Sequence, residues 1–411
     1  MRAEYWPRAA DGQLKRALQH AGVVLIEGPN GCGKATTAAQ TARSYLHLRY
    51  PWHRGGDPGP SDLAAIRLGP APRMFSGAEA VSGLTAAAAQ AAGSRTGEFI
   101  LTKSVRSGPV GAGVCRLRMR PMSFFESGES SGDVSLADLF EGGPLPEAPA
   151  ELTAAEAAFA MVRGGWPGML GLEEPAALRG AGEQLGTLVG LKLGRLGGPW
   201  RDAGHIGAMM RALSRCLVTC ASLDAIRASA AEDEFPVSEQ TAAQCLAVLD
   251  AAFLTEDVPA WHPPLRTRTV LRVQPKRQLA DPSLACAVMG LSPADLLSDV
   301  LWFTRLFKCA CLRDLRVYAG CLDGEVLHYR DASGLKADAV VMLPDGRWAA
   351  CEMALDVLGS EPAAARLLKL RDKVDTGELG LPSFLAVLTL SGEAHVRKDG
   401  VMVIPISVLK Y

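Results

Sequence analysis

The residues best suited to chemistry in this chain lie near its start, in the stretch VVLIEGPNGCGKATT at positions 23–37. Four apolar residues at 23–26 predict a buried strand, and the segment 28–34 matches the spacing G-x-x-x-x-G-K. Such a loop aims backbone N–H groups and a helix start at a phosphate, and its lysine adds a positive charge. The expected phosphate-binding residues are Gly28, Asn30, Gly31, Cys32, Gly33, Lys34, Ala35 and Thr36.

The residue after the lysine departs from this pattern. Serine or threonine is expected there, because its hydroxyl coordinates the Mg²⁺ that bridges the β- and γ-phosphates. Ala35 has no hydroxyl, and Thr36 points roughly 100° further around the helix, so it is not a simple substitute. We therefore expect a cradle for ATP or ADP in which coordination of Mg²⁺ is disfavoured.

The elements that must position this loop follow an α/β pattern. Helices are expected over residues 1–20 and from Lys34 to about Leu48, and strands over 98–104 and from 113 onward. Residues 295–411 alternate helix and strand again, with a long helix expected at 296–319. This predicts a second α/β domain with its own core.

The middle of the chain is mostly helical in pattern. Ser238 can cap a helix that is followed by the strand-like FLTEDV. This is the shape of a winged helix, and it is equally that of a helix and hairpin packed within a lid. The helix offers Glu239 and Gln240 but no cation to DNA, so phosphate contacts would have to come from the basic segment 263–277. DNA is therefore a weakly supported partner.

Composition excludes several classes of protein. A net charge of −1 provides no global basic field for nucleic acid. The ten cysteines form no C-x-x-C pair and the seven histidines form no ligand-spaced cluster, which argues against a zinc ribbon, a disulfide framework and a metal site. No apolar run is long enough for a bilayer, and the first residues do not resemble a signal peptide. We expect a cytoplasmic protein without a membrane partner.

Over nearly its full length the chain resembles the prokaryotic AAA-type P-loop ATPases that carry a C-terminal domain of unknown function. The resemblance rests on YWPRAADGQL, EGPNGCGK, FILTKS, RLRMRPMSFFESG, GGWP, DPSLA, DLRVYA and HYRDASGLKADAVV. It implies an AAA-like nucleotide-binding domain at 1–150 and a helical lid with a winged-helix-like region at 151–275. Residues 276–411 would then form a restriction-endonuclease-like domain of the PD-(D/E)XK type.

Against this family two sites look degenerate. The family's Asp-Glu pair, which holds Mg²⁺ and activates water, falls on Ser76 and Gly77, with Glu79 nearby but out of step. In the stretch FILTKS, Lys103 takes the place of a glycine in the family pattern. In the nuclease-like domain only the relict carboxylates Asp338 and Glu352 remain, while Ala354 replaces the motif lysine and Lys308 an early glutamate.

The favoured hypothesis is a non-hydrolysing nucleotide-binding, regulatory or scaffold protein, with a protein partner or a homo-oligomer as further expectations. The alternative is an active P-loop ATPase, DNA-associated or not, whose metal and base come from Glu79, Asp62 or a neighbouring subunit. A third hypothesis is that the nucleotide cleft has been recruited to unrelated small-molecule chemistry, with Cys32 as a nucleophile at a helix N-terminus. Nuclease activity is not expected.

Overall fold

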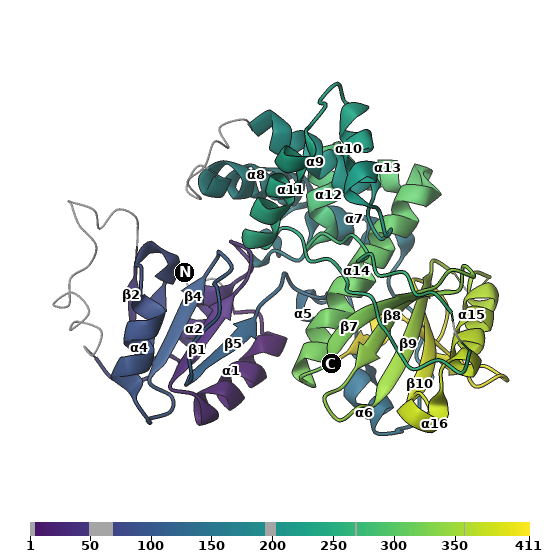
Figure 1. Ribbon diagram of the computed structural model, residues 1–411, viewed down its shortest axis with the longest axis horizontal. Coiled ribbons are helices and arrows are strands. Elements are labelled where there is room, and N and C mark those ends of the chain that lie inside the picture. The colour runs from purple at the N-terminus through teal and green to yellow at the C-terminus, as the bar shows by residue number, and fades with distance from the viewer. Residues whose placement is uncertain (1–4, 49–68, 194–202, 268, 357) are drawn as a thin grey trace. The chain divides into compact units, whose positions relative to one another are not determined.

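Five parallel strands form the sheet that carries the glycine-rich loop (Figure 1). The sheet order is β2-β3-β4-β1-β5, so the strand that precedes the loop lies inside the sheet. The strands are β1 (Val23–Glu27), β2 (Ser44–His47), β3 (Arg73–Ser76), β4 (Phe99–Lys103) and β5 (Val114–Arg118). The strands predicted at 98–104 and from 113 onward are confirmed as β4 and β5.

Helices cover both faces of this sheet. On one face α4 (Leu84–Ala92) packs on Val23, Leu25, Phe99 and Leu101, which share that face because side chains alternate along a strand. On the other face α1 (Ala9–His20) packs against β1 and β5, and α2 (Lys34–Thr41) packs against β3 and β4. The short helix η2 (Ala78–Ala80) follows β3. This is the α/β fold expected around a phosphate-binding loop.

The helix that follows the loop is shorter than predicted. It ends at Thr41, and residues 44–47 form the edge strand β2 where the sequence pattern indicated helix up to about Leu48. The open edge of β3 explains the difference, because the Arg43 N–H donates to the Pro72 carbonyl and the Leu48 N–H to the Ser76 carbonyl, each at 2.9 Å. Pairing with a neighbouring strand thus outweighs a weak local helical preference.

The structure is a computed structural model that describes residues 5–48, 69–193, 203–267, 269–356 and 358–411. The chain divides into two units, one of residues 1–121 with 250–253 and the other of residues 122–249 with 254–411. The division into three domains made from the sequence remains a prediction. None of the helices within the described ranges is long and apolar enough to span a membrane.

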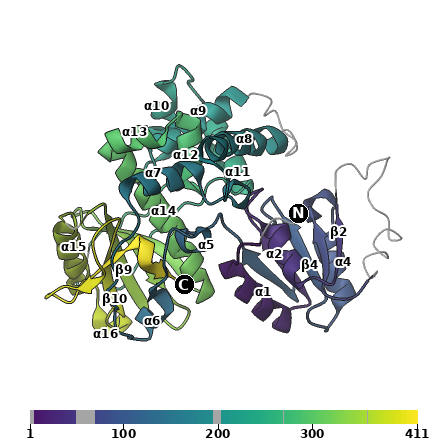
Figure 2. The same cartoon turned by 180° about the vertical axis from the view of Figure 1, so that it is seen from behind.

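Between residues 122 and 298 the second unit is mostly helical, and the first two of these helices lie beside the C-terminal sheet (Figure 2). Its helices are α5 (Phe124–Ser127), α6 (Leu136–Phe140), α7 (Ala154–Arg163), η3 (Pro167–Met169), α8 (Glu174–Leu193), α9 (Ala203–Arg215), α10 (Leu223–Ala231), α11 (Glu239–Ala251), α12 (Pro282–Met289) and α13 (Pro293–Ser298). The helix predicted at 296–319 is interrupted at Asp299, whose side chain accepts from the N–H groups of Leu301 and Trp302. That cap starts α14 (Val300–Cys321) as a separate helix.

A six-stranded mixed sheet completes the second unit, in the order β11-β12-β10-β9-β8-β7. Helix α14 packs on β7, β8 and β9, while α15 (Ser360–Lys373) packs on β8, β9 and β10. The strands are β7 (Glu325–Arg330), β8 (Lys336–Met342), β9 (Trp348–Ala354), β10 (Phe384–Thr389), β11 (His395–Val396) and β12 (Met402–Pro405). Short elements follow α15 and close the chain: α16 (Thr376–Leu379), η4 (Ile406–Val408) and β13 (Leu409–Lys410), which pairs with β6 (Val134–Ser135). The second α/β core predicted from the sequence is therefore present.

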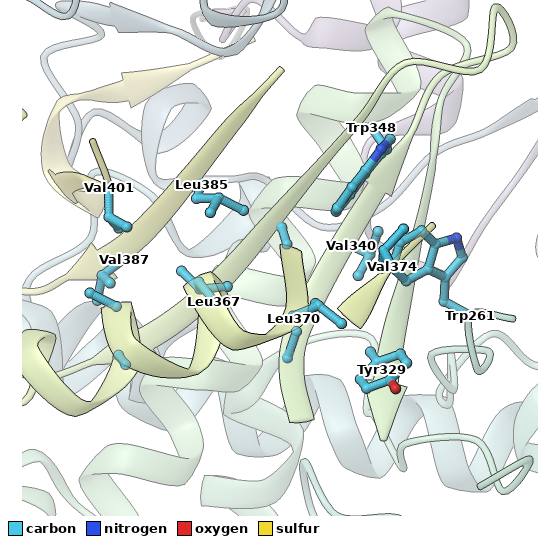
Figure 3. Close-up of a cluster of buried hydrophobic side chains, with 14 of the residues drawn as sticks. Trp261, Tyr329, Val340, Trp348, Leu367, Leu370, Val374, Leu385, Val387 and Val401 are labelled. Atoms are coloured by element: carbon cyan, nitrogen blue, oxygen red, sulfur yellow. The ribbon is translucent and has the colours of Figure 1, made fainter. Parts of the chain in front are cut away.

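A hydrophobic cluster lies between this sheet and α15 (Figure 3). Leu367 and Leu370 of the helix pack with Trp348 of β9, whose ring centroid lies 5.0 Å from that of Trp261. Trp261 is held there by its backbone, since its N–H donates to the His328 carbonyl at 2.7 Å. The segment before α12 is therefore bound to the edge of the C-terminal sheet.

Candidate functional site

The loop between β1 and α2 has a backbone that only glycine allows at three points. Gly31 and Gly33 have φ values of 83° and 98°, in the left-handed region that side chains disfavour. A Cβ at Gly28 would lie 2.0 Å from the carbonyl oxygen of Met119, so the backbones of these two residues are in close contact. The loop leads directly into α2, which places the first N–H groups of that helix at the carboxyl end of the parallel strands.

Lys34 is the buried cation of the loop. Its ammonium donates to the carbonyl oxygens of Gly28 at 2.9 Å and Pro29 at 2.7 Å. Burial lowers the pKa of Lys34, while the charge of Glu79 acts in the opposite direction. The ammonium is thus held by two carbonyl groups at the start of its own loop.

Arg8 anchors the loop from outside, and sequence reasoning did not single it out. It is 4 % exposed, and its guanidinium donates to the carbonyl oxygens of Cys32 at 2.7 Å and Arg120 at 2.9 Å. The arginine lies in the quoted stretch YWPRAADGQL, whose role the resemblance alone did not reveal. One buried side chain thus ties the start of α1 to the middle of the loop.

The remaining loop residues differ in exposure. Ala35 is half-buried and Thr36 is exposed at the start of α2, while Asn30 is half-buried. Cys32 is fully buried, and its sulfur lies 3.7 Å from the carbonyl oxygen of Met119. A thiol packed in this way fills space beneath the loop, which disfavours the nucleophile hypothesis.

The end of β3 has no carboxylate. Ser76 is buried there and its hydroxyl pairs with the imidazole of His47. Gly77 follows with φ of 75°, and a Cβ at this residue would lie 2.6 Å from the carbonyl oxygen of Leu48. The backbone at the position predicted to have lost its glutamate therefore leaves no room for a side chain.

Glu79 lies close to the loop although it is out of step with the family pattern. Its side chain is in η2, is exposed, and accepts from the Ser104 N–H at 3.4 Å. Burial lowers the pKa of Lys103, and the charges of Glu27 and Glu79 act against this shift. Among the described residues, Glu79 is thus the acid whose charge acts on both lysines. Asp62, the other acid considered, lies outside the described residues.

A charged row crosses the carboxyl end of the sheet. In the strand register Glu27 pairs with Lys103 of β4 on one side and with Arg118 of β5 on the other. Glu27 is buried and accepts from the Ser107 N–H at 2.9 Å, and the guanidinium of Arg118 lies 3.8 Å from the ring centroid of Phe253. With Lys34, the cations outnumber the acids among the described residues at this edge, which favours an anionic ligand.

Asp338, one of the two carboxylates predicted to be relicts, is neutralised by two lysines. Asp338 is 4 % exposed, and its two carboxylate oxygens lie 3.1 Å from the ammonium of Lys276 and 2.6 Å from that of Lys308. Burial would raise the pKa of Asp338, but the two ammonium groups outweigh it and hold this pKa well below its usual value. Asp338 is therefore a charged group with two fixed counter-ions.

Glu352 lies on the neighbouring strand. It is fully buried, and one of its oxygens forms an ion pair with Arg366 of α15, while the other has no hydrogen-bond partner. Burial and the charge of Asp338 raise the pKa of Glu352 despite this arginine. Across the described ranges, no set of three or more His, Cys, Asp or Glu side chains is arranged to hold a metal ion.

The basic segment predicted for DNA contact is partly engaged within the second unit, while its Arg266 and Arg272 are exposed. Lys276 is buried against Asp338, and Arg277 forms an ion pair with Asp257 at 2.5 Å. The backbone of segment 263–277 pairs with residues 256–258 on one side and with β7 on the other. Ser238 caps α11 as expected, accepting from the Thr241 N–H at 3.1 Å.

Comparisons with known proteins include a family match and a structural likeness. Residues 155–295 match the family model of a domain of unknown function (DUF8612), in the helical part of the second unit. A Walker-type ATPase of Pyrococcus abyssi is similar in structure at 15 % sequence identity and a TM-score of 0.44, over 70 % of this chain and 97 % of that chain. No curated protein matches the chain. A likeness at this level decides nothing about activity, which must be argued from the loop itself.

Proposed function

We propose that this chain binds ATP or ADP in the loop between β1 and α2 and hydrolyses it negligibly, as a nucleotide-dependent regulatory or scaffold protein. One observation carries the proposal. The loop that would hold phosphates keeps its glycine backbone and its buried Lys34. Ala35 provides no hydroxyl for a metal ion, and Ser76 and Gly77 provide no carboxylates. Binding groups persist where the groups needed for the chemical step do not.

Magnitudes separate binding from turnover. A metal ion contributes several kcal/mol of charge stabilisation at a transferred phosphoryl group, and about 4 kcal/mol corresponds to about a thousandfold in rate. Loss of a general base costs roughly another 10²–10⁴-fold. The loop amides and the lysine act on the bound ground state, so the affinity for nucleotide is much less affected than the rate.

The test is a pair of measurements on the full chain. Affinities for ATP and ADP are measured by calorimetry in MgCl₂ and in EDTA, and phosphate release is followed under saturating ATP. We expect binding in both buffers with a weak preference for Mg²⁺, and no turnover above background. Turnover above about 0.1 s⁻¹, against a usual enzyme range of about 1–10³ s⁻¹, would overturn the proposal. Absence of binding at millimolar nucleotide would show that the loop is vestigial.

The second candidate is a working ATPase that uses Glu79. Its support is the position of this carboxylate, which exerts its charge on both Lys34 and Lys103 at the loop edge. A carboxylate there is suited to orient an attacking water. Retained turnover that depends on Glu79 would favour this candidate over the first.

For the rest of the chain the resemblance supports weaker proposals. Residues 276–411 are proposed as a relict PD-(D/E)XK-like domain without nuclease activity, and the region around α11 as winged-helix-like. A DNA partner would show a negative slope of log affinity against log salt in filter binding. An affinity that does not change with salt would exclude DNA binding through phosphate contacts.

A further inference from the structure

The carboxylates of Asp338 and Glu352 lie near each other on two neighbouring antiparallel strands. The ladder of β8 and β9 ends at the pair Ala339–Cys351, and just beyond it the Met353 N–H donates to the Asp338 carboxylate at 3.3 Å. Asp338 therefore lies beside the stretch of β9 that carries Glu352, and its charge raises the pKa of that glutamate. Two buried acids in this position form the beginning of a cation site.

Three side chains from three separate segments neutralise this pair. Lys276 comes from the segment before α12 and is 5 % exposed, and its ammonium also donates to the Asp338 carbonyl at 2.8 Å. Lys308 comes from α14, and Arg366 from α15. Two acids therefore face three cations, and a divalent ion added to this set would meet net positive charge.

We infer that the ammonium groups of Lys276 and Lys308 take the place of a divalent cation at Asp338 and Glu352. The residues present do not fit a resident metal, because both oxygens of Asp338 are already used by lysines. The same contacts connect the segment before α12 to α14 and to β8. The ion pairs of Lys276 and Lys308 with Asp338 are thus an internal connection of the second unit that needs no metal. Removal of one of these lysines should expose a latent metal site.

The inference is tested first on the unchanged chain. Thermal unfolding is followed in EDTA and in millimolar MnCl₂, and bound Mn²⁺ is counted by electron paramagnetic resonance. A metal that binds only the folded state raises the unfolding midpoint. We expect the same unfolding midpoint in both buffers. We also expect the wild type and Asp338→Asn to bind the same amount of Mn²⁺. A midpoint raised by Mn²⁺ in the wild type but not in Asp338→Asn would overturn the inference.

A variant designed to create the metal site tests whether removal of a lysine exposes it. Lys308→Glu removes one ammonium and adds a third carboxylate beside the pair. We expect a lower midpoint in EDTA, recovery in MnCl₂, and one Mn²⁺ per chain that disappears when Asp338→Asn is added. A folded Lys308→Glu chain that binds no Mn²⁺ would contradict the latent site. Lys308→Met serves if the glutamate variant does not fold, with weaker Mn²⁺ binding expected at the two remaining carboxylates.

A matched control comes from another lysine paired with a buried aspartate. Lys373 contacts Asp331 at 2.5 Å, and the carboxylate of Asp331 also accepts from the hydroxyls of Tyr329 and Ser333. Lys373→Glu should lower the midpoint without any recovery in MnCl₂. If Mn²⁺ rescues both variants equally, the effect is a general response to added acid and the inference fails. These outcomes are independent of nucleotide, which is absent from all samples.

Discussion

The ammonium of Lys34 lies 2.9 Å from the carbonyl oxygen of Gly28, the first residue of its own loop. This contact and the one to Pro29 hold a buried cation at the base of the loop, where burial alone would favour its neutral form. A bound phosphate exchanges these neutral acceptors for a charged one, and hydrogen bonds between two charged groups are the stronger kind. The loop is therefore arranged to receive an anion.

The first prediction concerns this lysine. Lys34→Ala should weaken ATP binding by about 10–100-fold, because a charge-assisted hydrogen bond contributes about 1.5–3 kcal/mol. Calorimetry in EDTA measures the change without interference from a metal. Lys15→Ala in α1, an exposed lysine of the same unit, should leave the affinity unchanged. Equal affinity of wild type and Lys34→Ala would mean that nucleotide binds elsewhere.

The second prediction restores the missing hydroxyl. Ala35→Thr should tighten binding of ATP in MgCl₂ relative to EDTA by about tenfold, or ~1.4 kcal/mol, while phosphate release stays at background. The matched control is Ala35→Val, which has nearly the shape of threonine but no oxygen. A gain in both variants would show that size at this position, and not metal coordination, changes the affinity.

The third prediction concerns Gly77 at the end of β3, where the family resemblance leads us to expect a carboxylate. Gly77→Glu should destabilise the chain by about 1–3 kcal/mol and restore no turnover, because its φ of 75° and the close Leu48 carbonyl both oppose a side chain. Gly83 provides the comparison, since its φ is 74° but no atom lies within 4 Å of its would-be Cβ. Gly83→Glu should therefore cost less than Gly77→Glu in urea unfolding. Equal costs would mean that the contact with Leu48 has no effect.

The first unit shows which features could be predicted from the sequence and which could not. The loop, its strand and β4 followed from local patterns, because glycine spacing and apolar runs act within a few residues. The edge strand β2 did not, since its hydrogen bonds come from β3, which lies far along the chain. Nor could spacing show that Arg8 reaches the Cys32 carbonyl. Side-chain partners brought together by the fold leave no local signal.

The same reasoning explains the basic segment 263–277. Read alone, its cations looked available to DNA, but the structure buries Lys276 against Asp338. From the sequence, Lys308 is interpreted as the replacement of a family acid, and the structure shows that its ammonium contacts Asp338. The sequence shows where these charged residues stand, but only the fold shows which charges neutralise each other.

The fourth prediction distinguishes the two candidate functions. If the chain is a binding protein, Glu79→Gln should leave folding unchanged and tighten ATP binding by about 2–5-fold at low salt, because one exposed charge contributes about 0.2–1 kcal/mol. The gain should shrink in high salt. Glu174→Gln, an exposed change in the second unit, is the control. If wild type instead releases phosphate and Glu79→Gln reduces this at least about 100-fold, Glu79 acts as the base.

The fifth prediction concerns His328 of β7, which is 1 % exposed. Its Nε2 lies 3.1 Å from the Gln274 carbonyl oxygen, and Cys220 and Lys276 lie nearby. Burial, together with the charges of Lys276 and Arg330, lowers the pKa of His328 from 6.5 to about 4. The folded chain therefore holds this imidazole neutral at pH values where the unfolded chain binds a proton.

The sign follows from proton linkage. A lowered pKa in the folded state means that stability is complete above pH 6.5 and is lost as the pH falls toward 4. Between pH 7.5 and 5 the loss should be about 2 kcal/mol, at 1.36 kcal/mol for each pKa unit crossed. Urea unfolding at both pH values measures it, and His328→Gln, which keeps a donor for the Gln274 carbonyl, should lack most of this dependence. The same pH dependence in both chains would assign it to other groups.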